Sequence, residues 1–191
     1  MKIHTHPHKA DSEIKALLDL IPFGRADQLA LSVVAANIQA VIGLPTHVRT
    51  DRPDPDDAYM AARRQYDAIK ILNMLSEEKD GALFKLGVLQ NDLCIPILTY
   101  VYGESQLGGH AAVISLSRLY HIDRRVTCER GAKIGLHEVG HLLGLEHCRE
   151  SGCLMRFSKQ LAHLDLLPLR FCPACEYEIA RLLKRVMMNG R

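Results

Sequence analysis

Residues 137–148 read His-Glu-Val-Gly-His-Leu-Leu-Gly-Leu-Glu-His-Cys. Residues four apart on an α-helix lie nearly above one another, so a helix here would direct the imidazoles of His137 and His141 at one metal ion. Gly144 comes one turn later, where a glycine with positive φ can end the helix and turn the chain back. His147 would then approach the same ion from beyond the helix. The stretch therefore predicts a zinc site with three histidine ligands and a fourth position open to water.

The glutamate beside the first histidine completes the chemistry of such a site. Glu138 is not needed as a ligand, and it lies within reach of a water that the zinc polarises. We expect it to act as the general base of an amide hydrolysis and to pass the proton to the leaving amine. The alternative is a buried core helix with hydrogen-bonded histidines, which its apolar neighbours also permit. With the later glycine and histidine included, however, the motif arises by chance in roughly one in ten thousand such chains.

Four cysteines follow the histidines in two short-spaced pairs, Cys148 with Cys153 and Cys172 with Cys175. Each pair is close enough to chelate, and two such pairs make a tetrahedral structural zinc site. We do not expect disulfides, because the polar start of the chain lacks the apolar core of a signal peptide and cytosolic thiols stay reduced. A redox pair at Cys172-Pro-Ala-Cys175 remains an alternative. The sequence thus predicts two zinc ions per chain, one catalytic and one structural.

The other cysteines and the N-terminal histidines carry weaker signals. Cys94 and Cys128 stand apart from the cluster, and we expect them to be packing residues, because buried free cysteine behaves as a small hydrophobe. His4, His6 and His8 alternate at the start of the chain. That pattern indicates a disordered end or a fortuitous surface metal binder.

Composition bounds the partners of the protein. A chain of 191 residues with a net charge of +2 fits one domain without a strong attraction to nucleic acid or an anionic membrane. No apolar run approaches the length of a membrane span. We therefore expect a cytoplasmic monomer. A zinc module that binds nucleic acid is a competing interpretation, based on the four-cysteine segment and on the basic residues Arg181, Lys184, Arg185 and Arg191.

Hydrophobic periodicity predicts the order of helices and strands. The chain begins β-α-β, and its helices are expected to end at Gly43 and at Asp80-Gly81. Thr127 is the expected N-cap of the histidine helix, with Glu129 in its first turn. The expected strands are residues 14–23, 46–50, 85–89, 97–102 and 110–119; the expected helices are 27–42, 59–79, 127–144 and 176–188; the expected loops are 52–57 and 153–172.

The zinc motif with Gly144 and His147 resembles that of the metzincin metallopeptidases, in which a methionine-containing turn follows the third histidine and lies beneath the metal. Met155 stands in that place. The runs His147-Cys148, Cys153-Leu154-Met155 and Cys172-Pro-Ala-Cys175 resemble one branch, the archaemetzincins. The likeness covers the chain from about residue 12 onward. One departure is the gap of 16 residues between Met155 and Cys172, slightly shorter than in the family, which a loop can absorb.

The resemblance implies a single α+β domain with the zincin-like metzincin fold, in which a twisted mixed sheet packs with the active-site helix. Residues 12–147 would form an upper subdomain, and residues 148–191 a lower one with the Met-turn, the structural zinc and the C-terminal helix. A shallow cleft would run between them. Residues 110–116 would be its upper edge strand, to which a peptide can add as an antiparallel strand, with His110 near the rim.

The function that the resemblance implies is zinc-dependent hydrolysis of peptide bonds in peptide or protein substrates. A second oxyanion donor is not identified, because no tyrosine follows Met155 until Tyr177. The alternative is a zinc-stabilised protein of the same fold that holds peptides in its cleft and cleaves little.

Overall fold

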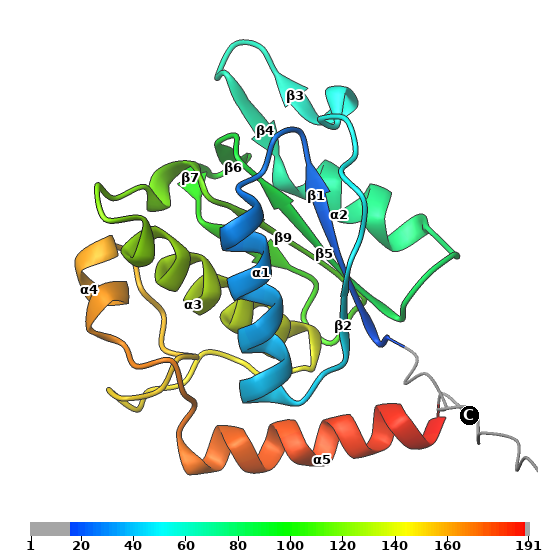
Figure 1. Cartoon of the computed structure of the whole chain (residues 1–191), viewed down its shortest axis with the longest axis vertical. Helices are drawn as coiled ribbons and strands as arrows, with labels where there is room; N and C mark the ends of the chain where they lie inside the picture. The colour runs from blue at the N-terminus through cyan, green and yellow to red at the C-terminus, as the bar shows by residue number, and fades with distance from the viewer. Residues whose placement is uncertain (1–15, 190–191) are drawn as a thin grey trace, which may run out of the picture.

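The computed structural model describes residues 16–189, and a five-stranded sheet lies at its centre (Figure 1). Its strand order is β2-β1-β5-β9-β8. Four of the strands run parallel, whereas β8 pairs antiparallel with β9 and forms one edge of the sheet. The strands are β1 (Leu18–Phe23), β2 (Thr46–Val48), β5 (Phe84–Leu89), β8 (Gly103–Ser105) and β9 (Ala111–Ser115). The mixed sheet expected from the sequence is thereby confirmed.

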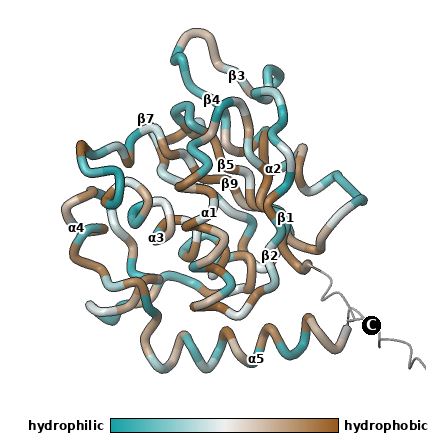
Figure 2. Tube along the Cα trace, in the orientation of Figure 1, coloured by the Kyte–Doolittle hydropathy of each residue, from teal (hydrophilic) through white to brown (hydrophobic). Residues whose placement is uncertain are grey.

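Helices cover both faces of this sheet, so its inner strands are buried on two sides. Helices α1 (Gln28–Asn37) and α3 (Arg124–Leu142) pack on one face, where Leu18 and Leu20 point. Helix α2 (Ala68–Glu77) packs on the other face, where Ile21 points. Figure 2 shows the hydrophobic residues gathered in the middle of the molecule, along β1, β5 and β9.

The first helix forms as the sequence predicts. The carboxylate of Asp27 caps α1 by accepting hydrogen bonds from the backbone N–H groups of Leu29 and Ala30, at 2.9 and 3.1 Å. A π-helical turn, η1 (Ile38–Ile42), extends the helix to Gly43, whose φ of 79° ends it. The predicted start at Asp27 and the predicted stop at Gly43 are both confirmed.

The helix predicted over residues 59–79 is wrong in its first half. Strands β3 (Tyr59–Met60) and β4 (Gln65–Asp67) form an antiparallel hairpin, and α2 begins only at Ala68. Two local features explain the difference. Arg64 has a φ of 53°, which a helix does not allow, and the side chain of Asp67 accepts a hydrogen bond from the N–H of Ile69, so it caps a helix that starts there.

This hairpin belongs to a second, smaller sheet with the order β3-β4-β6-β7. Strands β6 (Leu93–Ile95) and β7 (Leu98–Val101) complete it. The strand predicted over residues 97–102 is confirmed as β7. After Tyr102 the chain continues as β8 in the large sheet, a strand that the sequence did not predict.

The edge strand is not the one predicted. Strand β9 pairs with β5 on one side and with β8 on the other, so it is an inner strand. Its residues 111–115 are all buried, as an inner position requires. Residues Ser117–Leu119 form a 3₁₀ turn, η3, instead of extending the strand. The edge is β8, which is too short and too polar to give a strand pattern.

Helix α3 begins one turn earlier than predicted. Its N-cap is Asp123, whose carboxylate accepts a hydrogen bond from the N–H of Arg125 at 2.9 Å. Thr127 instead lies within the helix, where its hydroxyl accepts a hydrogen bond from the N–H of His121. Glu129 is therefore in the second turn.

The segment between Cys153 and Cys172 contains a helix that the sequence analysis missed, α4 (Leu161–Leu166). Two cations of α3 hold it. Arg130 donates two hydrogen bonds of 2.7 Å to the carboxylate of Asp165, and the buried ammonium of Lys133 donates to the carbonyl oxygens of Leu164 and Asp165. Each of these hydrogen-bonded pairs is separated by more than 30 residues in sequence, so no local sequence pattern predicts α4.

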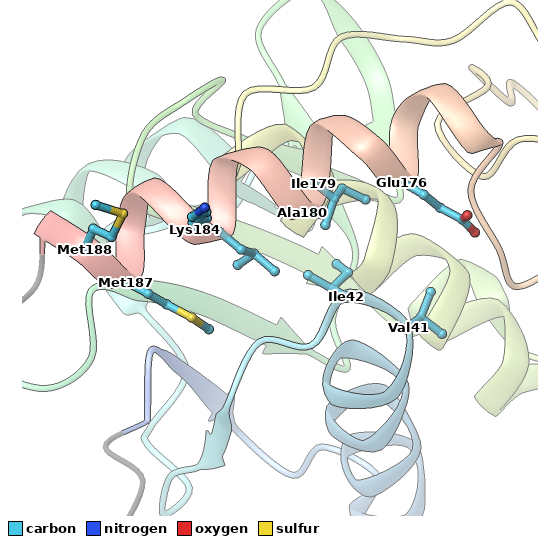
Figure 3. Close-up of a pocket in the computed structure, with 9 residues that line it drawn as sticks. Val41, Ile42, Glu176, Ile179, Ala180, Lys184, Met187 and Met188 are labelled. Atoms are coloured by element: carbon cyan, nitrogen blue, oxygen red, sulfur yellow. The ribbon is translucent and has the colours of Figure 1, made fainter.

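The C-terminal helix α5 (Pro173–Asn189) begins three residues before the predicted start. Its apolar face buries Ile179 and Leu183 against the rest of the core, as predicted. Between α5 and η1 lies a hollow of about 810 Å³, in which Ile179 faces Ile42 (Figure 3).

Among residues 16–189, no helix has the length and apolar character that crossing a membrane requires. His4, His6, His8 and Arg191 lie outside the described residues. The division into an upper and a lower subdomain stays a prediction.

Candidate metal centres and catalytic cleft

Three histidines converge at the end of α3. Their ligand atoms, from His137, His141 and His147, all lie within 4.8 Å of one another. His137 and His141 are one turn apart on the helix, and their Nε2 atoms are 3.1 Å apart. The sequence prediction brought these three residues together, and the structure does the same.

Backbone carbonyls fix which nitrogen of each helical histidine faces the centre. Nδ1 of His137 lies 2.9 Å from the carbonyl oxygen of Leu154, and Nδ1 of His141 lies 2.6 Å from that of Leu145. A carbonyl oxygen only accepts, so each Nδ1 carries the proton and each Nε2 presents a lone pair. Burial lowers the pKa of both imidazoles, which favours this neutral form.

Two lone pairs facing each other at 3.1 Å repel unless a cation lies between them. A tetrahedral zinc ion with Zn–N distances of about 2.0–2.1 Å would set two ligand nitrogens about 3.4 Å apart. The observed separation is close to that value. The donor set of His137, His141 and His147 therefore fits zinc.

Gly144 provides the reversal that brings the third histidine back. Its φ is 97°, and its N–H donates a hydrogen bond to the carbonyl of His141 at 2.8 Å. A residue with a Cβ would be strained in this conformation, so glycine suits the position. Beyond the turn, His147 is exposed, and the centroid of its ring lies 5.0 Å from the centroid of the Phe157 ring. The sequence analysis had no signal for Phe157.

Glu138 lies in the same cleft as the histidines and is only 7% exposed. Its Oε2 accepts a hydrogen bond of 2.6 Å from the hydroxyl of Ser105, on the edge strand β8. Burial raises the pKa of the carboxyl, and the Ser105 hydrogen bond opposes that shift. Ser105 is a second residue that the sequence analysis missed, because it lies 33 residues away in sequence.

The four cysteines form a second cluster, with all Sγ atoms of Cys148, Cys153, Cys172 and Cys175 within 4.8 Å of one another. Sγ of Cys148 and Sγ of Cys172 are 3.8 Å apart, and none of the four cysteines is in a disulfide. Four thiolates at Zn–S distances of about 2.3 Å would be about 3.8 Å apart, so the cluster fits a tetrahedral zinc. The presence of all four sulfurs favours this site over a two-cysteine redox pair.

Backbone hydrogen bonds and burial act in opposite directions on the thiols of this cluster, and burial raises the pKa of the Cys153 and Cys175 thiols. The N–H of Cys172 donates to Sγ of Cys153 at 3.3 Å, and a hydrogen bond from the backbone of Cys175 lowers the pKa of the Cys172 thiol. By contrast, Cys94 and Cys128 are buried elsewhere, at 0% and 4% exposure. Those two are packing residues, as predicted.

Met155 is fully buried beneath α3. A Cβ at Gly140 would lie 2.5 Å from Sδ of Met155, so the methionine packs directly against the helix between the two histidines. The carbonyl of Met155 also accepts a hydrogen bond from the N–H of Cys148 at 2.9 Å. The methionine turn thus touches both the helix and the four-cysteine cluster.

A cleft of about 800 Å³ runs past the histidines and Glu138. Its lining includes strand β8, Leu154, residues 156–159, Leu164 and Leu167. His110, which was expected near the rim of the cleft, is exposed and is not among the residues that line the cleft. Its ring stacks on the ring of Phe84, with the two ring centroids 6.2 Å apart.

Two ionisable residues in the cleft lining were not singled out from the sequence. Burial, together with the negative charge of Glu138, raises the pKa of Glu104 to about 6. Burial and a hydrogen bond with Tyr100 raise the pKa of Tyr102 to about 12. Tyr102 lies on the opposite side of the histidine motif from Met155 in sequence and precedes the histidine helix by more than 20 residues.

Comparison with known proteins identifies the same family as the resemblance. The family model described as peptidase family M54 matches residues 24–181. A curated archaemetzincin from Archaeoglobus fulgidus is 41% identical over 121 residues, which are 63% of this chain and 72% of that protein. One from Pyrococcus furiosus is 30% identical over 93% of this chain and 100% of its own length.

Solved structures agree with this result. The crystal structure of archaemetzincin from Methanopyrus kandleri has a TM-score of 0.83 and 32% identity to this chain, and the match covers 93% of this chain and 100% of that one. The fold expected from the resemblance is thereby confirmed. The chain belongs to peptidase family M54, the archaemetzincins, and is a zinc metallopeptidase.

Proposed function

We propose that the protein hydrolyses peptide bonds at a zinc ion held by His137, His141 and His147, with Glu138 as the general base. The observation that carries the proposal is the meeting of the three imidazoles and a buried carboxylate in one cleft. When bound, zinc supplies Lewis acidity, which polarises a carbonyl and acidifies water. The neutral imidazoles leave that positive charge largely uncompensated, which favours this chemistry.

Glu138 performs the proton transfers. Its carboxylate accepts a proton from the attacking water and later delivers it to the nitrogen of the leaving amine. Burial supports this role, because a carboxylate shielded from bulk water is a stronger base than an exposed one. Among the described residues, no cation forms a salt bridge with this carboxylate, and the hydroxyl of Ser105 engages only its Oε2.

Strand β8 is the site where the substrate backbone would bind. It is the outer strand of the large sheet and lines the cleft, so one row of its N–H and C=O groups is available to a peptide. A peptide or protein segment would add there as an antiparallel strand. The edge assigned to residues 110–116 from the sequence thus moves to β8.

The second zinc would have a structural role. Cys148, Cys153, Cys172 and Cys175 would hold it without an open position, as structural zinc sites do. That ion would cross-link the start of α5 to the methionine turn and so stabilise the proposed lower subdomain.

Zinc counting combined with a peptide digest tests the proposal. Wild type should bind two zinc ions and cleave a proteome-derived peptide library. A His147→Ala variant should lose one zinc and all cleavage, whereas Glu77→Ala, an exposed glutamate on α2, should keep both. Cleavage by the His147 variant at the wild-type rate would contradict the proposed site. Peptide binding by wild type without any cleavage would instead support the weakly catalytic alternative.

A further inference from the structure

We infer that Ser105 is a positioning residue for Glu138, and that Ser105 and Gly103 together form a seat on β8 that holds the base in place. The inference rests on the proposed function, because it concerns the residue that we assign as general base. The zinc-binding motif does not predict this positioning role, because Ser105 and Gly103 belong to an edge strand that lies outside the motif.

The hydrogen bond is short and specific. The hydroxyl of Ser105 donates to Oε2 of Glu138 at 2.6 Å, which is the length of a hydrogen bond between a hydroxyl and a carboxylate. Within residues 16–189, Ser105 is the one hydrogen-bond partner of that carboxylate. Without it, a 93% buried carboxylate would have no donor from the protein, a state that is costly for a charged group.

The register of the sheet explains why this serine reaches the helix. Strand β8 pairs with β9 so that Gly103 is opposite Ile114 and Ser105 is opposite Ala112. Ile114 and Ala112 pack in the core on the α3 side of the sheet. Directly opposed residues share a face, so Gly103 and Ser105 face α3.

Gly103 closes the other side of the seat. A Cβ at this position would lie 2.7 Å from both Cγ and Oε1 of Glu138, closer than real side chains approach. The absence of a side chain lets the strand backbone lie directly against the glutamate. The carboxylate is therefore confined by contact at Gly103 and oriented by the hydroxyl of Ser105.

This arrangement leaves one carboxylate oxygen for chemistry. Oε2 is engaged by Ser105, and Oε1 has no hydrogen-bond partner among the described residues. A proton taken from water can reside on Oε1 while the Ser105 hydrogen bond to Oε2 persists. Because β8 is also the proposed docking edge for the peptide, the same strand sets the positions of base and substrate relative to each other.

A pair of variants at Ser105 tests the role of the hydroxyl. Ser105→Ala should lower kcat by about 10- to 100-fold with little change in KM and with both zinc ions retained. Ser105→Thr keeps a hydroxyl and suits a strand, so it should restore most of the kcat. Loss of kcat in the threonine variant equal to that in the alanine variant would contradict a role for the hydroxyl.

Ser115→Ala is the matched control. Ser115 is also a buried serine of the large sheet, and its hydroxyl donates to the carbonyl of Asn91 at 2.7 Å, away from the cleft. This variant should lower the melting temperature and leave kcat unchanged. If Ser115→Ala lowered kcat as much as Ser105→Ala, the effect would be structural and the inference would fail.

A crystal structure of the zinc-loaded Ser105→Ala protein gives a readout independent of activity. The carboxylate of Glu138 should leave its wild-type position or occupy several; an unchanged single position would overturn the inference. The two proposals also fail differently. Turnover that survives Glu138→Ala would refute the proposed function, whereas an inactive Glu138→Ala beside a fully active Ser105→Ala would refute only the positioning role.

Discussion

The carbonyl oxygen of Leu154 accepts a hydrogen bond of 2.9 Å from Nδ1 of His137. Leu154 stands between Cys153, a member of the four-cysteine cluster, and Met155, which packs beneath the histidine helix. Its own N–H donates to the carbonyl of Arg170 at 3.0 Å, two residues before Cys172. One short segment therefore orients a ligand of the first metal centre and carries a ligand of the second.

This link predicts that the structural centre supports catalysis. Cys175→Ala should lose one zinc ion and lower activity by about 10- to 100-fold, because the segment that orients His137 loosens. Zinc analysis and the peptide digest measure both effects. Cys128→Ala, a buried cysteine outside the cluster, should keep two zinc ions and its activity. A one-zinc Cys175→Ala protein with wild-type activity and stability would show that the two centres are independent.

Gly140→Ala should overpack the contact between α3 and the methionine turn. The new Cβ would lie 2.5 Å from Sδ of Met155, so we expect a loss of about 1–3 kcal/mol in the free energy of unfolding. Urea denaturation measures this loss. Gly152→Ala is the control, because nothing lies within 4 Å of its Cβ position. Equal stability of the two variants would contradict the packing role of Met155.

The ion pair between Asp165 and Arg130 predicts a pH-dependent contribution to stability. The guanidinium of Arg130 lowers the pKa of Asp165, so the carboxylate binds its proton more weakly in the folded protein than in the unfolded chain. Its stabilising contribution is then fully present above the unfolded pKa of about 3.9 and is lost as the pH falls through the folded pKa.

Urea midpoints of wild type and Asp165→Asn should therefore differ most at neutral pH and converge as the pH falls below about 4. Comparing the two proteins at each pH cancels the loss of metal in acid. Asp80→Asn, at an exposed position without an ion pair among the described residues, should match wild type throughout. A difference for Asp165→Asn that stayed constant with pH would mean that the ion pair is not its source.

Lys133→Met should detach α4 from the histidine helix. Lys133 is 2% exposed, and its ammonium pairs with Glu129 at 2.7 Å besides binding two carbonyls at the end of α4. Methionine fills similar space without these hydrogen bonds, so amide hydrogen exchange in residues 161–166 should accelerate. Lys79→Met, at an exposed position, should leave exchange there unchanged. Unaltered protection of α4 in Lys133→Met would contradict its anchoring role.

The sequence predicted the metal centres better than the surrounding strands. The ligand spacing of His137 and His141 follows from helix geometry, and the turn at Gly144 follows from its tolerance of positive φ. Both are local properties. Met155 was placed by resemblance, and its contact with Gly140 explains why the turn and the helix fit together.

The errors arose where distant residues decide the structure. Strand β8 has three residues and no hydrophobic alternation, and its partner β9 makes it a strand. Helix α4 depends on Arg130 and Lys133 from another helix. The hydrogen bond from Ser105 to Glu138 likewise spans the chain between two elements, so spacing alone does not reveal it.

Cleavage by the zinc-loaded Glu138→Ala protein is the most direct test of the central claim, that a zinc site and Glu138 together hydrolyse peptide bonds. Wild type and the variant would be given the same proteome-derived peptide library, with zinc content measured in the same samples. Two zinc ions in both proteins, with cleavage by wild type alone, is the predicted result. Cleavage by Glu138→Ala at the wild-type rate would contradict the account.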